Sequence, residues 1–201
     1  DWYMLASEFL SAEPANGYGT NCRVNFRIRG VIDREGAALF SAVVKRASEL
    51  DFDAASIVLD SRGGDADAAI AMARLIRRSD LFSRLPVVAR IAEDYQSVCF
   101  SACVVLFSAA YERELDFNID NDPRLPSRIG IHGPGQFNRV RSTYDSSAGN
   151  TEIARVNRRL KEYFRSIDVN EALVDDMFAV PFDQIRLLTR DELASYGLYA
   201  N

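Results

Sequence analysis

Hydrophobic and polar residues alternate with two different periods along the chain. Residues 23–32 follow a period of two, with Val24, Phe26 and Ile28 on one face, which predicts a half-buried strand. Residues 34–50 place apolar side chains every three or four positions, which predicts a helix. The two periods then alternate to the end of the chain. This alternation predicts a layered α/β domain.

The same patterns predict the remaining elements. Strands are expected at residues 56–59, 86–92 and 128–132, and helices at residues 66–78, 101–111, 151–167, 170–178 and 191–196. Asp33 is expected to cap the first helix, whose buried stripe is predicted to contain Leu39, Val43, Val44, Ala47 and Leu50. Residues 112–127 and 136–150 break the alternation and are interpreted as exposed loop insertions. Residues 1–201 are expected to form a single domain, with residues 1–21 as an N-terminal extension.

Composition narrows the classes of partner. The 201 residues are 48% hydrophobic, enough to bury one core without disulfides or metals to hold it. A net charge of −5 leaves no excess of positive charge for phosphates, so nucleic acid is not expected as a partner. No apolar run reaches the roughly 18 residues needed to cross a bilayer, so no transmembrane segment is expected. The first residue is Asp1 rather than Met, which we interpret as the mark of a processed or trimmed product.

The chain has three cysteines, Cys22, Cys99 and Cys103. They lack the Cys or His partners of a zinc site, so no metal is expected. Cys99 and Cys103 are too far apart to bond if both belong to a regular helix, and a bridge from Cys22 to either of them is equally open. The alternative is that all three are small buried hydrophobic residues.

Candidate chemistry starts from His132, the one histidine of the chain. Imidazole is the side chain best suited to proton transfer near neutral pH. A single histidine at a strand end is more often structural than catalytic. Here, however, Gly133, Pro134 and Gly135 follow at once, so the ring is expected at the mouth of a turn rather than on a packed face. This position suits a general base.

A general base needs a nucleophile, and Ser101 is placed where an apolar helix begins. Free N–H groups and the helix dipole there favour negative charge on a bound acyl oxygen. The alternative is that Ser101 is only the helix N-cap. Gly63 and Gly64 lie at a strand-to-helix turn, where the lack of side chains suits an oxyanion hole as well as a plain turn. The order of these three features is more specific than any one of them.

In this order the sequence resembles the proteolytic subunit of Clp protease and its relatives in the crotonase superfamily. Residues 59–65 are similar to the family's oxyanion turn, with Arg62 where proline is usual, and residues 100–103 fall at its nucleophile motif. Residues 131–134 are similar to its Ile-His-Gln-Pro, and residues 188–198 to its closing motif. The resemblance implies a Clp-protease/crotonase-type α/β fold of repeated β-β-α/β-α units with a mostly parallel sheet.

The resemblance also implies roles for particular residues. Ser101 would be the nucleophile, His132 the general base, and the amides of Gly64 and Ala102 the oxyanion hole, with catalysis through an acyl-enzyme. Asp183 is expected to orient His132, with Asp175 or Asp176 as substitutes and a Ser-His dyad as a further alternative. The residues expected to bind a peptide or protein substrate are Gly63, Asp65, Gly133 and Pro134. No cofactor is expected.

Cysteines on both sides of the serine are similar to those of divergent, stand-alone Clp-like proteins that are predicted to be exported in bacteria. That likeness implies a periplasmic or secreted protein that acts without an ATP-driven unfoldase. Residues 151–167 are a candidate contact of a homo-oligomer, although their many charges equally suit a solvated face.

Four classes of function are compatible with these observations. An ATP-independent serine peptidase or related hydrolase is favoured. Two departures from the family pattern favour a non-catalytic Clp-like binding or assembly module: Arg62 stands where proline is usual, and the position of the triad aspartate is uncertain. A crotonase-like acyl-CoA enzyme would use the same oxyanion geometry without a Ser-His pair, and acyl-CoA should then raise its melting temperature. A redox role for Cys99 and Cys103 comes last, because their spacing is not that of a dithiol motif.

Overall fold

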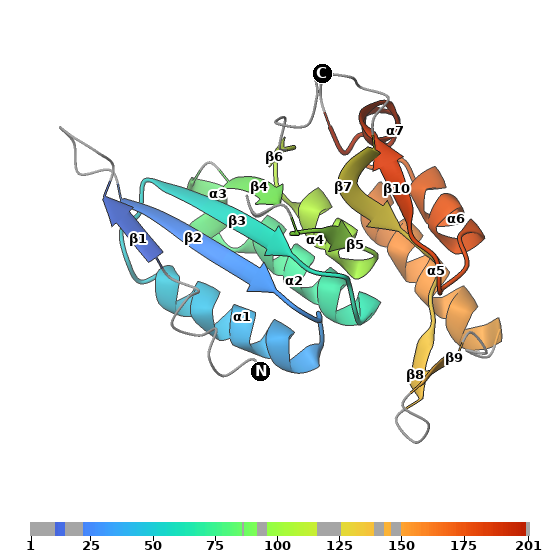
Figure 1. Ribbon diagram of the computed structural model, residues 1–201. Coiled ribbons are helices and arrows are strands. Elements are labelled where there is room, and N and C mark those ends of the chain that lie inside the picture. Colours follow the sequence, from blue (N-terminus) through green and yellow to red (C-terminus); the bar gives the residue numbers. More distant parts are fainter. Residues whose placement is uncertain are drawn as a thin grey trace. The chain divides into compact units, whose positions relative to one another are not determined.

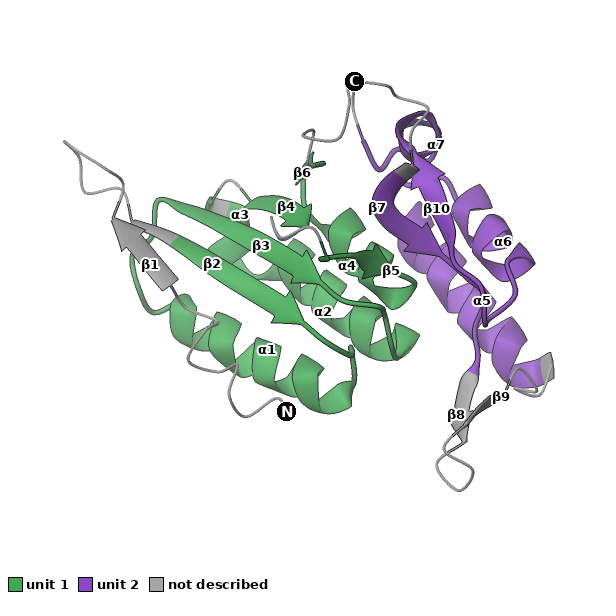
Figure 2. Cartoon of the chain, in the orientation of Figure 1, with its two compact units in different colours: residues 1–121 green, residues 122–201 purple. Residues whose placement is uncertain are grey.

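A computed structural model describes residues 11–14, 22–85, 87–91, 96–115, 126–138, 143–145 and 150–199. The chain divides into two compact units, Asp1–Asn121 (unit 1) and Asp122–Asn201 (unit 2), which Figure 2 colours separately. Each unit is described by itself. The single domain expected over residues 1–201 stays a prediction.

Unit 1 is built on a five-stranded, mostly parallel sheet in the order β1-β2-β3-β4-β6 (Figure 1). Its strands are β1 (Ser11–Pro14), β2 (Cys22–Arg29), β3 (Ala54–Asp60), β4 (Val87–Ile91) and β6 (Glu112–Glu114). Only β1 is antiparallel to its neighbour, and it lies at one edge of the sheet. The α/β class with a mostly parallel sheet, predicted from the sequence, is confirmed.

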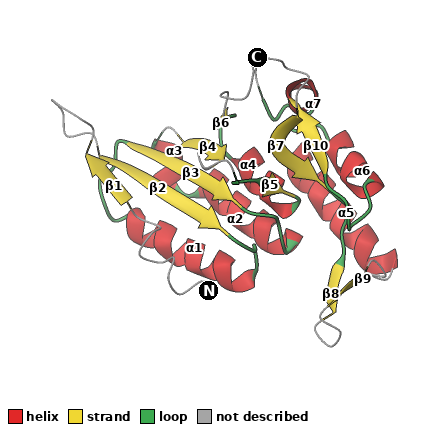
Figure 3. Ribbon diagram, viewed as in Figure 1, coloured by secondary structure: helices red, strands yellow, loops and turns green. Residues whose placement is uncertain are grey.

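The strands of unit 1 are joined by helices that lie alongside the sheet (Figure 3). These helices are α1 (Arg34–Ala47), α2 (Ala66–Arg78), α3 (Asp80–Arg84) and α4 (Ala102–Ala109). A two-residue strand, β5 (Cys99–Phe100), directly precedes Ser101 and α4. Helix α2 has the predicted bounds because Asp65 caps its first turn, accepting hydrogen bonds from the N–H groups of Asp67 and Ala68.

The core of unit 1 follows the predicted periods, with one correction. Phe26 of β2 is fully buried and packs edge-on against Phe40 and Phe82, with ring centroids 5.9 and 5.2 Å apart. The predicted stripe of α1 omitted Phe40 and included Leu50, which is 43% exposed. The helix ends at Ala47, and residues about 3.6 positions apart, from Phe40 through Val44 to Ala47, share its buried face.

The described residues of unit 2 form two antiparallel pairs of strands and three helices. Its strands are β7 (Pro126–Ile131) and β10 (Arg186–Thr189), and its helices are α5 (Asn150–Arg165), α6 (Ala172–Ala179) and α7 (Arg190–Ser195). A short hairpin joins β8 (Gln136–Asn138) to β9 (Thr143–Asp145). One face of the C-terminal half of α5 is buried, because Leu160, Tyr163 and Phe164 are at most 3% exposed.

Both stretches interpreted as loops contain strands. Residues 112–114 form β6, parallel to β4, and the stretch 136–150 contains the hairpin of β8 and β9. The remaining residues of the two insertions, apart from residues 115, 126–127 and 150, lie outside the described part of the chain. β6 carries the sequence Glu-Arg-Glu, which suits a sheet edge but offers no apolar alternation to detect. None of the helices that the structure describes has both the length and the apolar character needed to cross a membrane.

Candidate active site

The glycine turn after β3 is held in place by a buried serine that sequence patterns did not single out. The hydroxyl of Ser61 donates to the carbonyl of Gly30 at 2.6 Å and accepts from the N–H of Gly63 at 3.1 Å. The backbone of Ser61 also bonds to the two residues that flank Cys99: its N–H donates to the carbonyl of Val98, and its carbonyl accepts from the N–H of Phe100. Ser61 therefore ties the glycine turn to the strand that precedes Ser101.

Gly63 and Gly64 both have a positive φ, +103° and +149°, which favours glycine. A Cβ atom at Gly64 would lie 2.0 Å from the carbonyl oxygen of Ile32. A Cβ atom at Gly63 would lie 2.7 Å from the Cβ of Ser101 and 3.2 Å from the amide nitrogen of Ala102. The glycines thus allow their turn to lie directly against the turn at Ser101.

Ser101 has an unusual backbone conformation, with φ 54° and ψ −119°. Such conformations cost a non-glycine residue about 1–3 kcal/mol and occur mostly at functional sites. Ser101 stands at the N-cap position of α4, but its side chain makes no capping hydrogen bond. The N-cap role, weighed as the alternative for this serine, therefore does not account for its hydroxyl.

Two backbone N–H groups of these turns, those of Gly64 and Ala102, donate to no backbone acceptor among the described residues. The bridge between Ile32 and the glycine turn uses the carbonyl of Gly63 and the N–H of Asp65, and it leaves out the N–H of Gly64 between them. The N–H of Ala102 belongs to the first turn of α4, where a helix provides no acceptor. These are the two amides that the resemblance assigned to an oxyanion hole.

A disulfide joins Cys99 and Cys103, with the sulfur atoms 2.09 Å and the Cα atoms 5.2 Å apart. We expected the pair to be too distant if both lay in one helix. Cys99 instead lies in β5, and the chain reverses at Ser101 before α4 begins. Both cysteines are fully buried, and the bond links the two sides of the Ser101 turn. The side chain of Cys22 lies outside the described part of the structure.

His132 directly follows β7 in unit 2 and is partly buried. Its Nδ1 atom lies 2.7 Å from the carbonyl oxygen of Gly133. Its ring meets the ring of Phe182 nearly at right angles, with the centroids 5.3 Å apart. Gly135 is close to the same aromatic ring, since a Cβ atom there would lie 2.3 Å from it. Ser101 belongs to unit 1 and His132 to unit 2.

The aspartates considered as partners of His132 have other surroundings. Asp183 is exposed, and no hydrogen bond or ion pair joins it to His132 among the described residues. Asp175 forms an ion pair with Lys161 at 2.6 Å. Asp176 accepts a hydrogen bond from the hydroxyl of Tyr196.

The other residues expected to bind substrate have partly structural roles. The carboxylate of Asp65 caps α2, as described above. Gly133 is buried, its N–H donates to the carbonyl of Val180 at 2.8 Å, and a Cβ atom there would lie 2.9 Å from that oxygen. Pro134 is half-buried in the turn after His132.

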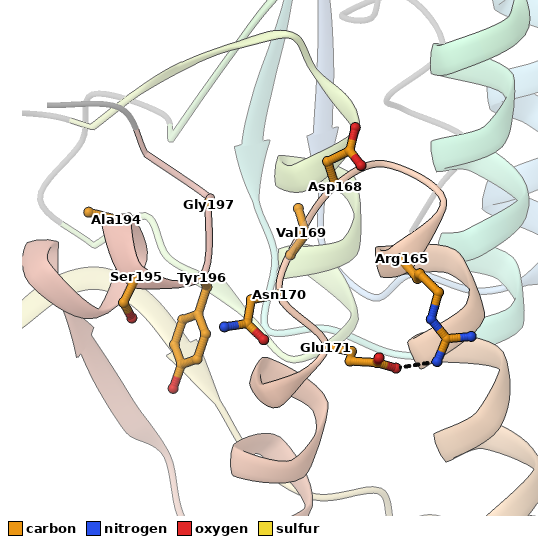
Figure 4. Close-up of a pocket in the computed structure, with 9 residues that line it drawn as sticks. All are labelled: Arg165, Asp168, Val169, Asn170, Glu171, Ala194, Ser195, Tyr196 and Gly197. Carbon is orange, nitrogen blue, oxygen red and sulfur yellow. Dashed lines mark hydrogen bonds and ion pairs between the residues drawn. The ribbon is translucent and has the colours of Figure 1, made fainter.

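A surface hollow of about 470 Å³ lies in unit 2 between the α5–α6 connection and the end of α7 (Figure 4). It contains none of the candidate catalytic residues. Two of its three charged side chains, Arg165 and Glu171, pair with each other at 2.6 Å, and the side chain of Asn170 accepts from the N–H of Ala172. These contacts are those of a closed helix connection rather than of a ligand site.

Comparison with known proteins supports the fold but does not establish an activity. No protein-family model matches the sequence, and no curated protein matches it significantly. Solved structures do match. A mutant of the 1510-N membrane-bound stomatin-specific protease in complex with a substrate peptide has a TM-score of 0.59 and 18% sequence identity, covering 88% of this chain and 72% of its own.

A second similar structure is ClpP1 from Listeria monocytogenes, with a TM-score of 0.55 and 16% identity, covering 87% of both chains. Identities this low establish a shared architecture and not a shared activity. The chain therefore has the fold of the Clp proteolytic subunit and of the stomatin-specific protease.

Proposed function

We propose that this protein is a serine peptidase or related hydrolase that needs no ATP. In this proposal Ser101 is the nucleophile, His132 is the general base, and the amides of Gly64 and Ala102 form the oxyanion hole. One observation carries the proposal: Ser101 adopts a strained turn whose hydroxyl does not cap α4, and this turn lies directly against the paired glycines. A strained serine that does not cap its helix, together with two N–H groups that have no backbone acceptor, suits acyl transfer.

The proposed reaction has two steps. The Oγ atom of Ser101 attacks the substrate carbonyl carbon while His132 takes the hydroxyl proton, and the oxygen that becomes negative accepts hydrogen bonds from the two amides. The carbon–nitrogen bond then breaks, and His132 gives its proton to the departing amine. Water, deprotonated by His132, attacks the acyl-enzyme, and the Ser101 oxygen leaves as the hydroxyl with the proton returned to it.

A peptide or protein substrate is proposed because one similar structure, the stomatin-specific protease, is a protease by name and holds a substrate peptide. We also propose a periplasmic or secreted location. The disulfide between Cys99 and Cys103 supports it, because such bonds persist in oxidising compartments. Action without ATP is proposed because of this location and because of the resemblance to stand-alone Clp-like proteins.

The test is mass spectrometry after treatment with a fluorophosphonate near neutral pH. We expect a single adduct on Ser101, no adduct in Ser101→Ala, and labelling slowed by about 10²-fold or more in His132→Ala. Ser195→Ala, which removes an exposed serine of α7, is the matched control and should label like the wild type. Dependence of the adduct on His132 would show that the two residues act together.

A non-catalytic binding module is the second candidate. Two observations favour it. No hydrogen bond or ion pair joins Asp183 to His132 among the described residues, and the exposed Arg62 stands where the family's oxyanion turn has proline. This candidate predicts no adduct in protein shown to be folded by circular dichroism. It also predicts that Ser101→Ala leaves the set of bound partners unchanged.

A further inference from the structure

We infer that Phe182 and the backbone carbonyl of Gly133 orient His132, in the role that a carboxylate has in a Ser-His-Asp triad. This inference rests on the proposed function, in which His132 is the general base. Phe182 is thus a positioning residue, since it acts through the imidazole and not on the substrate. The inference needs only contacts within unit 2.

The carbonyl of Gly133 decides which nitrogen of His132 carries the proton. A carbonyl oxygen only accepts hydrogen bonds, so the 2.7 Å contact places a proton on Nδ1. In the neutral ring the lone pair is then on Nε2, which is the nitrogen that accepts the serine proton in a triad. An aspartate bonded to Nδ1 would select the same tautomer.

Phe182 restricts the rotation of the imidazole. The two rings meet at 78° with their centroids 5.3 Å apart, the edge-to-face arrangement that aromatic rings prefer. Phe182 is itself confined, because the position of a Cβ atom on Gly135 lies 2.3–2.6 Å from three atoms of its ring. The glycine at position 135 is thus what allows the aromatic ring to stand beside His132.

One short segment supports both contacts. The carbonyl of Val180 accepts a hydrogen bond from the N–H of Gly133 at 2.8 Å, which fixes the backbone beside the carbonyl that faces Nδ1. Phe182 follows two residues later and supplies the ring. Asp183 comes next, but it is exposed, whereas Asp175 and Asp176 contact Lys161 and Tyr196.

The single histidine makes the tautomer measurable without assignment. In protein labelled with ¹⁵N-histidine, all imidazole signals belong to His132. For the neutral imidazole we expect the spectrum of a ring with its proton on Nδ1. A proton on Nε2 would overturn the inference whether or not Ser101 reacts with any probe.

Labelling kinetics of Ser101 test the positioning role. We expect Phe182→Leu, which keeps an apolar side chain but no ring, to lower the maximal labelling rate by about 10- to 100-fold with little change in probe affinity. Phe182→Tyr, which keeps the ring, should restore most of the rate. Ile185→Ala changes a nearby exposed apolar side chain and is the matched control.

Asp183→Asn tests the competing explanation, in which Asp183 orients His132. If Asp183 orients His132, this variant loses as much rate as Phe182→Leu and its pH profile of labelling differs from the wild type, which would contradict the inference. We expect the labelling rate of Asp183→Asn and its pH profile to match those of the wild type. Circular dichroism and the ¹⁵N spectrum of each variant show that the fold is intact. Failure of the wild type to label would overturn the proposed function, whereas the tautomer result would still decide the inference.

Discussion

At the scale of a single residue, the backbone of Ser101 shows that this position is not optimised for stability. Its φ of 54° with ψ −119° is rare for any residue with a Cβ atom, and the side chain gains no capping hydrogen bond in return. Proteins retain such strain where function requires it. The backbone of Ser101 therefore lowers the stability of the fold at the residue that is the proposed nucleophile.

A pair of variants separates these two effects. Ser101→Ala keeps the Cβ atom and the strain, whereas Ser101→Gly removes both. We expect Ser101→Gly to be about 1 kcal/mol more stable than Ser101→Ala in urea unfolding, although glycine also gains entropy in the unfolded chain. Neither variant should be labelled. Equal stabilities would mean that the strain at Ser101 is no larger than this entropic cost of glycine.

At the scale of one element, α7 begins with a reciprocal capping box. The side chain of Thr189 accepts from the N–H of Glu192, while the carboxylate of Glu192 accepts from the N–H of Thr189 at 2.8 Å. Arg186 also donates to this carboxylate. Burial by itself would raise the pKa of Glu192, but these hydrogen bonds outweigh it and hold the pKa below its ordinary value of 4.5.

The lowered pKa predicts how stability depends on pH. The ionised carboxylate of Glu192 contributes fully to the free energy of unfolding above its unfolded-state pKa of 4.5. This contribution is lost as the pH falls through the lower folded-state pKa. We expect Glu192→Gln to be less stable than the wild type at neutral pH and the difference to shrink below pH 4.5 in urea unfolding. Thr189→Ala, which removes the cap, should cost about 1 kcal/mol. A difference that does not change with pH would exclude the carboxylate charge as its cause.

The disulfide across the Ser101 turn gives a second prediction at this scale. The tryptic peptide of residues 91–113 contains both Cys99 and Cys103, so in unreduced protein it should lack two hydrogens relative to the reduced peptide. Replacing both cysteines by alanine should lower the free energy of unfolding by roughly 2 kcal/mol, as loop-closure entropy predicts for so short a loop. A peptide of full reduced mass, or one joined to Cys22, would contradict the pairing.

At the scale of the whole molecule, each unit has its own buried aromatic side chains, with Phe26 in unit 1 and Phe164 in unit 2. Residues 122–201 alone are near the size at which a single core becomes marginal. We therefore expect one cooperative unfolding transition for the whole chain. Phe26→Ala and Phe164→Ala should each lower the free energy of unfolding of the whole chain by about 3–5 kcal/mol. Two transitions, each responding to only one variant, would contradict the single domain.

The fold was predictable where elements carry a strong period. Helix α2 has the bounds expected from its cap and apolar stripe, and β2 alternates as its sequence does. β5, β6 and β10 escaped prediction because strands of two to four residues are too short to show a period. Their pairing with distant strands or residues defines them instead.

The order of the paired glycines, a serine at a helix start and a histidine at a strand end was readable from the sequence alone, since each is a local signal. So was the α/β class, because the period of hydrophobic residues depends only on local geometry. Tertiary structure decided the pairing of Cys99 with Cys103, the strained turn of Ser101, and the contact of His132 with Phe182 and the Gly133 carbonyl. These features depend on where the chain reverses and on which distant atoms then meet, and no local pattern specifies that.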